Sequence, residues 1–349
     1  MKWINSLTRC IAASAVLFLM TAAAKPVMAG SLSADTIALF PKETGEFAYA
    51  DLKKARTMKW FPALQEQMLP ERFKQFEKFL ASAGVDPNTA VDEVAWGLVA
   101  QSAAKQDTTA AATATATAAA SNVPESEEIV GIALGTFNPD STEAYFKQQK
   151  LITSKSRGYT LFAFGSGSGP NDLFFFFIDS NKAAFGHKQL LEKLIEIRYG
   201  AEDGVMRNDK LYSLINEANG SGVVWAVLDP SYTRLAMSQL APEVEQFPDA
   251  AKLVQNMQSM IISITASSGI EGKFQGVCAS TEDANTLSQL MTAGLLYKKY
   301  QATKDNPELG QLLDQASVTP SGDRVVISLT VSDDQMTSLI RKNTFAIKM

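Results

Sequence analysis

The chain has 349 residues with 37 acidic and 32 basic side chains, which gives a formal net charge of −5. An acidic chain without a cluster of lysine and arginine is a poor partner for phosphate backbones, so we expect no nucleic-acid ligand. A single histidine and two cysteines leave no set of side chains that could hold zinc, and no cofactor-binding motif is present.

Residues 1–29 have the pattern of a secretory signal peptide. Lys2 and Arg9 precede an apolar run over 10–24, and a small residue, Ala29, stands where a signal peptidase reads. The run of about 15 residues is shorter than the roughly 20 that a membrane-spanning helix needs. We therefore expect cleavage near Ala29, a periplasmic or secreted protein, and no transmembrane segment in the mature chain.

Removal of residues 1–29 would leave 29 basic residues against 37 acidic ones and Cys278 as the single cysteine. No intramolecular disulfide can then form, so stability must come from the burial of apolar side chains. The remaining 320 residues are enough chain for two ordinary hydrophobic cores.

In the first half of the mature chain, strand and helix patterns alternate. The expected strands are 47–52, 94–100, 128–137, 159–164, 173–179 and 183–185, and the expected helices are 62–83, 140–149 and 187–200. Phe73, Phe76 and Phe79 recur at helical spacing, which predicts a stripe that faces the core rather than a cofactor. The run 173–178 has no polar alternation, so we expect a central strand with both faces covered.

An Ala/Thr-rich insertion over 102–124 interrupts this pattern. Its lack of large apolar residues leaves nothing to bury, so an ordered structure would cost backbone entropy with little return. It falls between two expected strands, 94–100 and 128–137, and we expect it to be a disordered tip of a hairpin, where insertions are tolerated.

The second half repeats the order of the first. Its expected strands are 223–228, 260–266, 270–279 and 324–331, and its expected helices are 232–240, 244–257, 280–300, 307–315 and 333–341. This order predicts an α+β protein of two related βαββαβ, ferredoxin-like units over 30–204 and 205–349, with antiparallel sheets covered by helices. Whether the two sheets join is left open by the sequence.

Several of these features together resemble a loose group of secreted bacterial proteins of unknown function. The features are the export signal, the strand ending in Asp in both halves, the segment 225–229 and the helix 280–300. The resemblance covers most of the mature chain and includes no specific motif. It implies export and a duplicated α+β fold, and it implies no activity.

Two carboxylates stand at matching places in the two halves. Asp51 and Asp229 each close a strand and precede helical sequence, so each can accept hydrogen bonds from free backbone amides at a helix start. Paired carboxylates are also the minimum set for acid–base catalysis, and a carboxylate-dependent hydrolase with its site between the repeats is therefore an alternative. Nothing in the sequence brings the two residues to one substrate, so we prefer capping.

A histidine and a cysteine could in principle take part in catalysis, but no residue near either of them in the sequence would activate it. His187 is the only histidine and begins the helix 187–200, so we interpret it as a solvated helix-start residue. Cys278 shares strand parity with Phe274, which places it on an apolar side and predicts an inert thiol.

Three glycines, Gly97, Gly131 and Gly135, lie on the less bulky parity of two neighbouring strands. Another backbone or a flat ligand could approach closely there, although we prefer packing beneath a helix.

No group of residues forms a catalytic, metal-binding or cofactor-binding signature, and the sequence identifies no ligand-binding residue. We therefore expect a non-catalytic exported protein that serves as a binding or scaffold component of the cell envelope. Its partner would be a protein or another envelope component. The hydrolase is the alternative, and a structural component of a surface assembly is a third hypothesis.

Overall fold

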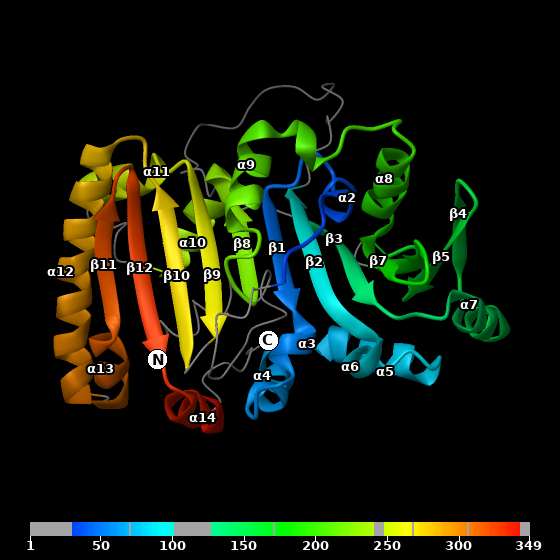
Figure 1. The fold of residues 1–349 in the computed structure, drawn as a ribbon, viewed down its shortest axis with the longest axis horizontal. Helices are drawn as coiled ribbons and strands as arrows, with labels where there is room; N and C mark the ends of the chain where they lie inside the picture. The colour runs from blue at the N-terminus through cyan, green and yellow to red at the C-terminus, as the bar shows by residue number, and fades with distance from the viewer. Residues whose placement is uncertain are drawn as a thin grey trace, which may run out of the picture.

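The computed structural model describes residues 30–69, 71–100, 127–169, 172–240, 248–266, 269–305 and 307–342. The predicted signal peptide and the whole Ala/Thr-rich insertion lie outside these residues. The strands of the described chain form one sheet with the order β11-β12-β10-β9-β8-β1-β2-β3-β7-β6-β5-β4 (Figure 1). Neighbouring strands are antiparallel throughout, which confirms the predicted α+β class with antiparallel pairing.

The strands have these bounds: β1 Glu46–Asp51, β2 Val91–Ala100, β3 Glu127–Gly135, β4 Thr153–Ser156, β5 Tyr159–Phe164, β6 Leu173–Phe177, β7 Lys182–His187, β8 Val224–Leu228, β9 Ser259–Ala266, β10 Ile270–Val277, β11 Ala316–Ser321 and β12 Arg324–Val331. The helices are α2 Ala34–Ile37, α3 Leu52–Ala55, α4 Phe61–Met68, α5 Glu71–Ser82, α6 Pro87–Ala90, α7 Pro139–Gln148, α8 Lys188–Arg198, the short η1 Val205–Arg207, α9 Asp209–Ala218, α10 Pro230–Leu240, α11 Pro248–Gln255, α12 Thr281–Asp305, α13 Pro307–Asp314 and α14 Asp333–Arg341.

The strand order corrects the ferredoxin-like prediction. In a ferredoxin-like unit, another strand separates the two strands that the first helix connects. Here β1 pairs directly with β2, and β8 pairs directly with β9, both antiparallel. The order of elements along the chain was compatible with either arrangement, because it does not specify which strands become neighbours in the sheet.

The two halves nevertheless follow one plan in the sheet. The first three strands of each half lie side by side in chain order, as β1-β2-β3 and as β8-β9-β10. The third strand of each half then pairs with the last strand of that half, β3 with β7 and β10 with β12. A repeated plan of this kind is compatible with a duplication, which stays a prediction.

Strands β1 and β8 join the halves at the centre of the sheet. Ala48 lies opposite Ala226, with Glu46 opposite Leu228 on one side and Ala50 opposite Val224 on the other. The pairing is therefore symmetric about the two alanines. This pair is continuous with both halves, so one sheet runs through the whole described chain. The sequence had left open whether the sheets of the two halves join.

Helices cover the two faces of the sheet unequally. The face that carries Trp96, here called the Trp96 face, packs against α3, α4, α5, α6, α10, α11, α12 and α14. The opposite face carries Trp225, and this Trp225 face packs against α2, α8 and α9. At its centre the ring of Trp225 stacks between Phe47 and Tyr49, with centroids 5.6 and 5.5 Å away. Strand β6, predicted to be central with both faces covered, is buried along its whole length, but it lies third from the β4 edge of the sheet rather than at its centre.

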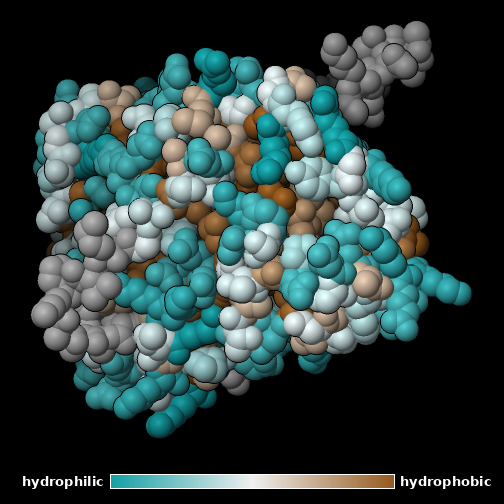
Figure 2. All heavy atoms as spheres, turned by 45° about the vertical axis from the view of Figure 1, so that its right-hand side comes forward, coloured by the Kyte–Doolittle hydropathy of each residue, from teal (hydrophilic) through white to brown (hydrophobic). Residues whose placement is uncertain are grey.

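Helix α12 carries apolar residues at helical spacing, and only part of this stripe is buried. Leu287 is fully buried, whereas Leu290 and Tyr297 are 43% and 61% exposed. The stripe is continuous in the sequence, but its burial is not, because α12 runs along the edge strand β11 at one end of the sheet (Figure 1). At the other end, the surface turned forward in Figure 2 is mostly polar, and apolar side chains reach it only in small separate areas.

Candidate functional site

The two carboxylates of the hydrolase alternative are helix caps. Asp51 Oδ1 accepts a hydrogen bond from the Lys54 amide at 2.7 Å. Asp229 Oδ1 accepts from the amides of Ser231 and Tyr232, at 2.7 and 2.9 Å. The capping role that the sequence predicted for both residues is therefore confirmed.

The sheet also keeps these carboxylates apart. Asp51 donates its amide to Val223, at one end of the β1–β8 pair, and Asp229 donates its amide to Gly45, at the other end. Residues 45 and 51 are six positions apart, which at about 3.3 Å per residue corresponds to roughly 20 Å. The structure therefore does not bring Asp51 and Asp229 to one small substrate.

His187 and Cys278 have structural surroundings. His187 Nδ1 accepts a hydrogen bond from the Ile129 amide at 2.9 Å, so the ring is partly buried against β3 rather than solvated as the sequence suggested. The Cys278 thiol is buried, and this burial raises its pKa to about 11. A thiol with so high a pKa is a poor nucleophile near neutral pH.

The three glycines do not share one open face. Gly131 lies opposite Trp96 on the Trp96 face, so Gly97, the next residue along β2, points to the Trp225 face. The ring of Phe185 covers Gly131, and a Cβ at Gly97 would meet Thr44 at 2.9 Å. A Cβ at Gly135 would collide with the backbone carbonyl of Ala90. Each glycine therefore accommodates a close neighbour from the chain itself, and none is left open to a flat ligand.

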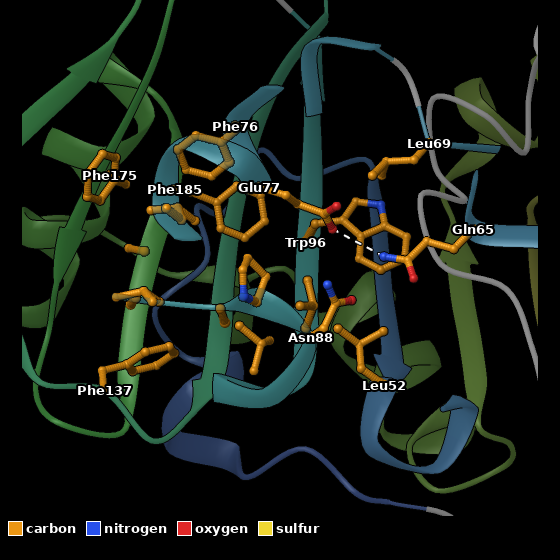
Figure 3. A pocket seen from close by; sticks show the side chains of 18 of the residues that line it. Leu52, Gln65, Leu69, Phe76, Glu77, Asn88, Trp96, Phe137, Phe175 and Phe185 are labelled. Atoms are coloured by element: carbon orange, nitrogen blue, oxygen red, sulfur yellow. Dashed lines mark hydrogen bonds between the residues drawn. The ribbon is translucent and has the colours of Figure 1, made fainter. Parts of the chain in front are cut away.

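A cavity of about 150 Å³ lies on the Trp96 face, between the sheet and helices α4, α5 and α6. Small side chains from adjacent strands, Ala133 of β3 and Ala183 of β7, stand opposite each other in its lining. Large rings complete the lining: Phe61, Phe76, Trp96, Phe137, Phe175, Phe177 and Phe185. Figure 3 labels five of them, Phe76, Trp96, Phe137, Phe175 and Phe185. The small residues on the sheet leave space that the helices above do not fill.

The sequence places aromatic residues around this space for two separate reasons. Phe76 belongs to the predicted stripe of α5, and its ring lies 5.7 Å from that of Phe175, centroid to centroid. Phe175 is buried on β6, and Phe185 lies directly opposite it on the neighbouring strand β7. The cavity is therefore walled by a helix and by strands that are distant in the chain.

Four polar side chains line the cavity: Arg56, Gln65, Glu77 and Asn88. Arg56 Nη2 donates to the carbonyls of Pro87 and Val91, at 3.0 and 2.6 Å, and thereby ties the end of α3 to the start of β2. Gln65 Nε2 donates to Glu77 Oε1 at 3.2 Å, as the dashed line in Figure 3 shows.

Burial shifts both charged groups of the lining toward their neutral forms. Burial lowers the pKa of Arg56, although nearby carboxylates such as Asp92 and Asp86 favour the charged guanidinium. It raises the pKa of Glu77, and the hydrogen bond from Gln65 only partly offsets this effect. The predicted stripe of α5 consists of Phe73, Phe76 and Phe79, and nothing in the sequence distinguishes Glu77 from an ordinary polar residue of that helix, so its part in the cavity was missed.

The cavity has the chemistry of a binding site for apolar groups. Hydrocarbon and aromatic surface dominates the lining, and its few polar groups can orient a ligand. Within the described residues, no cluster of three or more His, Cys, Asp or Glu side chains could hold a metal ion. The helices of these residues are each too short or too polar to cross a bilayer.

Comparison with known proteins adds no activity. No family model matches the chain, and no curated protein matches it. Among solved structures, TP0453 in crystal form I is similar at 11% sequence identity with a TM-score of 0.45. The comparison covers 89% of this chain and 97% of that chain. A likeness of this level carries no conclusion about function.

Proposed function

We propose that the chain is a non-catalytic binding protein whose cavity holds the apolar part of a small ligand. The observation that carries the proposal is the space of about 150 Å³ between Ala133, Ala183 and the surrounding rings. An apolar cavity of about this size is large enough to take up a benzene-sized molecule. A ligand would restore the contacts that the lining atoms lack while the space is empty.

We place this binding function outside the cytoplasm, in the periplasm or the medium, and in a component of the cell envelope. The support is the signal-peptide pattern of residues 1–29. The intact mass of the protein recovered from the envelope or the medium should correspond to a chain that begins at Gly30. A recovered chain that still contained Met1 would contradict export with cleavage.

The hydrolase alternative gains no specific support. It needs two carboxylates at one substrate, and Asp51 and Asp229 lie at opposite ends of the β1–β8 pair, each occupied as a helix cap. A scaffold role would use the surface of the protein, and the cavity would then have no part in it.

Binding can be tested with toluene as the probe on the chain from residue 30 onward. We expect toluene to raise the melting temperature of the unaltered protein, because a ligand that binds only the folded state stabilises it. The variant Ala133→Leu fills part of the cavity and should lose most of this shift. The matched variant Ala95→Leu alters a buried alanine on the Trp225 face, away from the cavity, and should keep it. If toluene leaves the unaltered protein unchanged, the proposed function is wrong.

A further inference from the structure

Glu77 is the one carboxylate in the cavity lining, and among the described residues no cation forms an ion pair with it. Its only hydrogen-bond partner in the described chain is the neutral amide of Gln65, at 3.2 Å. No described lysine or arginine comes within ion-pair distance of it. Lys74, one turn earlier on α5, pairs with Glu66 instead at 2.6 Å. The cavity therefore contains a half-buried carboxylate whose charge is largely unmatched.

Arg56, the one cation of the lining, is in the opposite situation. Its guanidinium already donates to two backbone carbonyls. Four carboxylates also favour its charge: Asp92, Asp86, Glu77 and Asp51. For Glu77 the balance of charges is reversed, because Asp86 and Glu66 act against its negative charge, whereas Arg56 and the hydrogen bond from Gln65 favour it. Of the two charged groups, the carboxylate is therefore the one that a ligand could best complement.

The aromatic walls favour the same sign of ligand charge. Trp96, Phe76 and Phe185 line the same cavity as Glu77. The face of an aromatic ring attracts a cation that lies within about 6 Å of its centre and repels an anion. The rings and the carboxylate would thus act together on a positive group, and an anionic group would meet both unfavourably.

Resting on the proposed function, we infer that the ligand is a small amphiphile with an apolar body and a protonated amine. The body occupies the space beside Ala133, and the ammonium donates a hydrogen bond to the Glu77 carboxylate. Such charge-assisted hydrogen bonds are roughly twice as strong as neutral ones. Since Glu77 is only half-buried, the ammonium can keep part of its hydration while it binds.

Three probes with similar bodies and different end groups test this inference: benzylamine, benzyl alcohol and phenylacetate. Their dissociation constants for the chain from residue 30 onward would be measured by calorimetry at pH 7 and low salt. We expect benzylamine to bind about 5-fold more tightly than benzyl alcohol, from the difference between charged and neutral hydrogen bonds. Phenylacetate should bind most weakly.

The variant Glu77→Gln keeps the shape of the side chain and removes its charge. It should bind benzyl alcohol with nearly unchanged affinity and lose the preference for benzylamine. Glu66→Gln is the matched control, because Glu66 is a neighbouring carboxylate that is exposed and absent from the lining. This control should keep the preference for benzylamine.

The outcomes separate the two proposals. If none of the three probes binds, the proposed function fails and the inference fails with it. If benzyl alcohol binds but phenylacetate binds more tightly than benzylamine, the cavity function stands and the inference about the ligand is overturned. A preference for benzylamine that survives in Glu77→Gln would also overturn it, because another group would then recognise the amine.

Discussion

Filling the cavity at Ala133 should stabilise the protein. A fully enclosed space of about 150 Å³ would cost roughly 3.6 kcal/mol of stability at about 24 cal/mol per Å³, and this is an upper bound because the space is partly open to the surface. Ala133→Leu adds three carbons, worth at most about 2.4 kcal/mol at about 0.8 kcal/mol for each buried methylene. Part of this gain is lost to side-chain ordering and imperfect fit, so we expect a net increase of about 1 kcal/mol in the free energy of unfolding.

Urea denaturation measures this change as a shift of the midpoint at constant slope. Ala95→Leu is the control, since Ala95 is fully buried on the Trp225 face and does not line the cavity. Extra carbons in such a filled site cost about 1–3 kcal/mol, so this variant should lose stability. The reasoning is refuted if Ala133→Leu loses as much stability as Ala95→Leu, because the space beside Ala133 would then not exist in solution.

Three further predictions concern single side chains. Asp51→Ala and Asp229→Ala should each lower the free energy of unfolding by about 1 kcal/mol, since each removes a helix cap, and the losses should add in the double variant because the sites are far apart. Cys278 should react with a thiol reagent at pH 7.5 only after urea unfolds the protein, because burial raises its pKa to about 11; rapid labelling of the folded protein would contradict this. Burial raises the pKa of Glu77 above its ordinary value of 4.5, so the folded state favours the neutral carboxyl. The folded protein therefore loses stability as the pH rises from about 4.5 through the raised pKa. Glu77→Gln should therefore gain stability relative to the unaltered protein from pH 4 to pH 7 and match it at pH 4, and a constant difference across this range would contradict the buried position of Glu77.

The sequence predicted most strands because their apolar pattern is local. Alternation along β2 and β12 and the unbroken apolar run of β6 each show how many faces the strand buries. Strand β11 was missed, since it is a mostly exposed edge strand with little apolar patterning to detect. Helix α9 was missed as well, although Leu211 and Ile215 give it a buried face at helical spacing.

The cavity could not be predicted in the same way, because it arises from the volumes of side chains on elements distant in the chain. One signal was available: the less bulky side of β3, which carries Gly131 and Ala133. The ring of Phe185 covers the glycine, while Ala133 is left beside open space. The spacing along β3 cannot distinguish these outcomes, since they depend on what β7 and α5 place above each residue.

The division of the chain into units 30–204 and 205–349 stays a prediction, and the shared sheet changes what it implies. Separation there would leave β1 and β8 each without a partner on one side, and unpaired edges of apolar strands favour aggregation. It would also part Trp225 from the rings of Phe47 and Tyr49 that stack on it.

Other contacts cross the same boundary. Asn219 at the end of α9 exchanges two hydrogen bonds of 2.9 Å with the backbone of Leu32. Val205 donates its amide to the carbonyl of Phe40 at 2.7 Å. The segment before β1 is therefore held in place by residues that follow position 204.

We therefore expect neither fragment, 30–204 or 205–349, to unfold cooperatively when it is produced alone, and we expect the co-produced fragments to assemble and unfold as one unit. Circular dichroism during urea denaturation, together with size-exclusion chromatography, would measure both properties. The reason is energetic: each fragment alone exposes the apolar surface of the central strand pair, which the other fragment normally covers. If either fragment alone gives a sharp, reversible transition and remains monomeric, the β1–β8 contact is a dispensable junction between two independent cores.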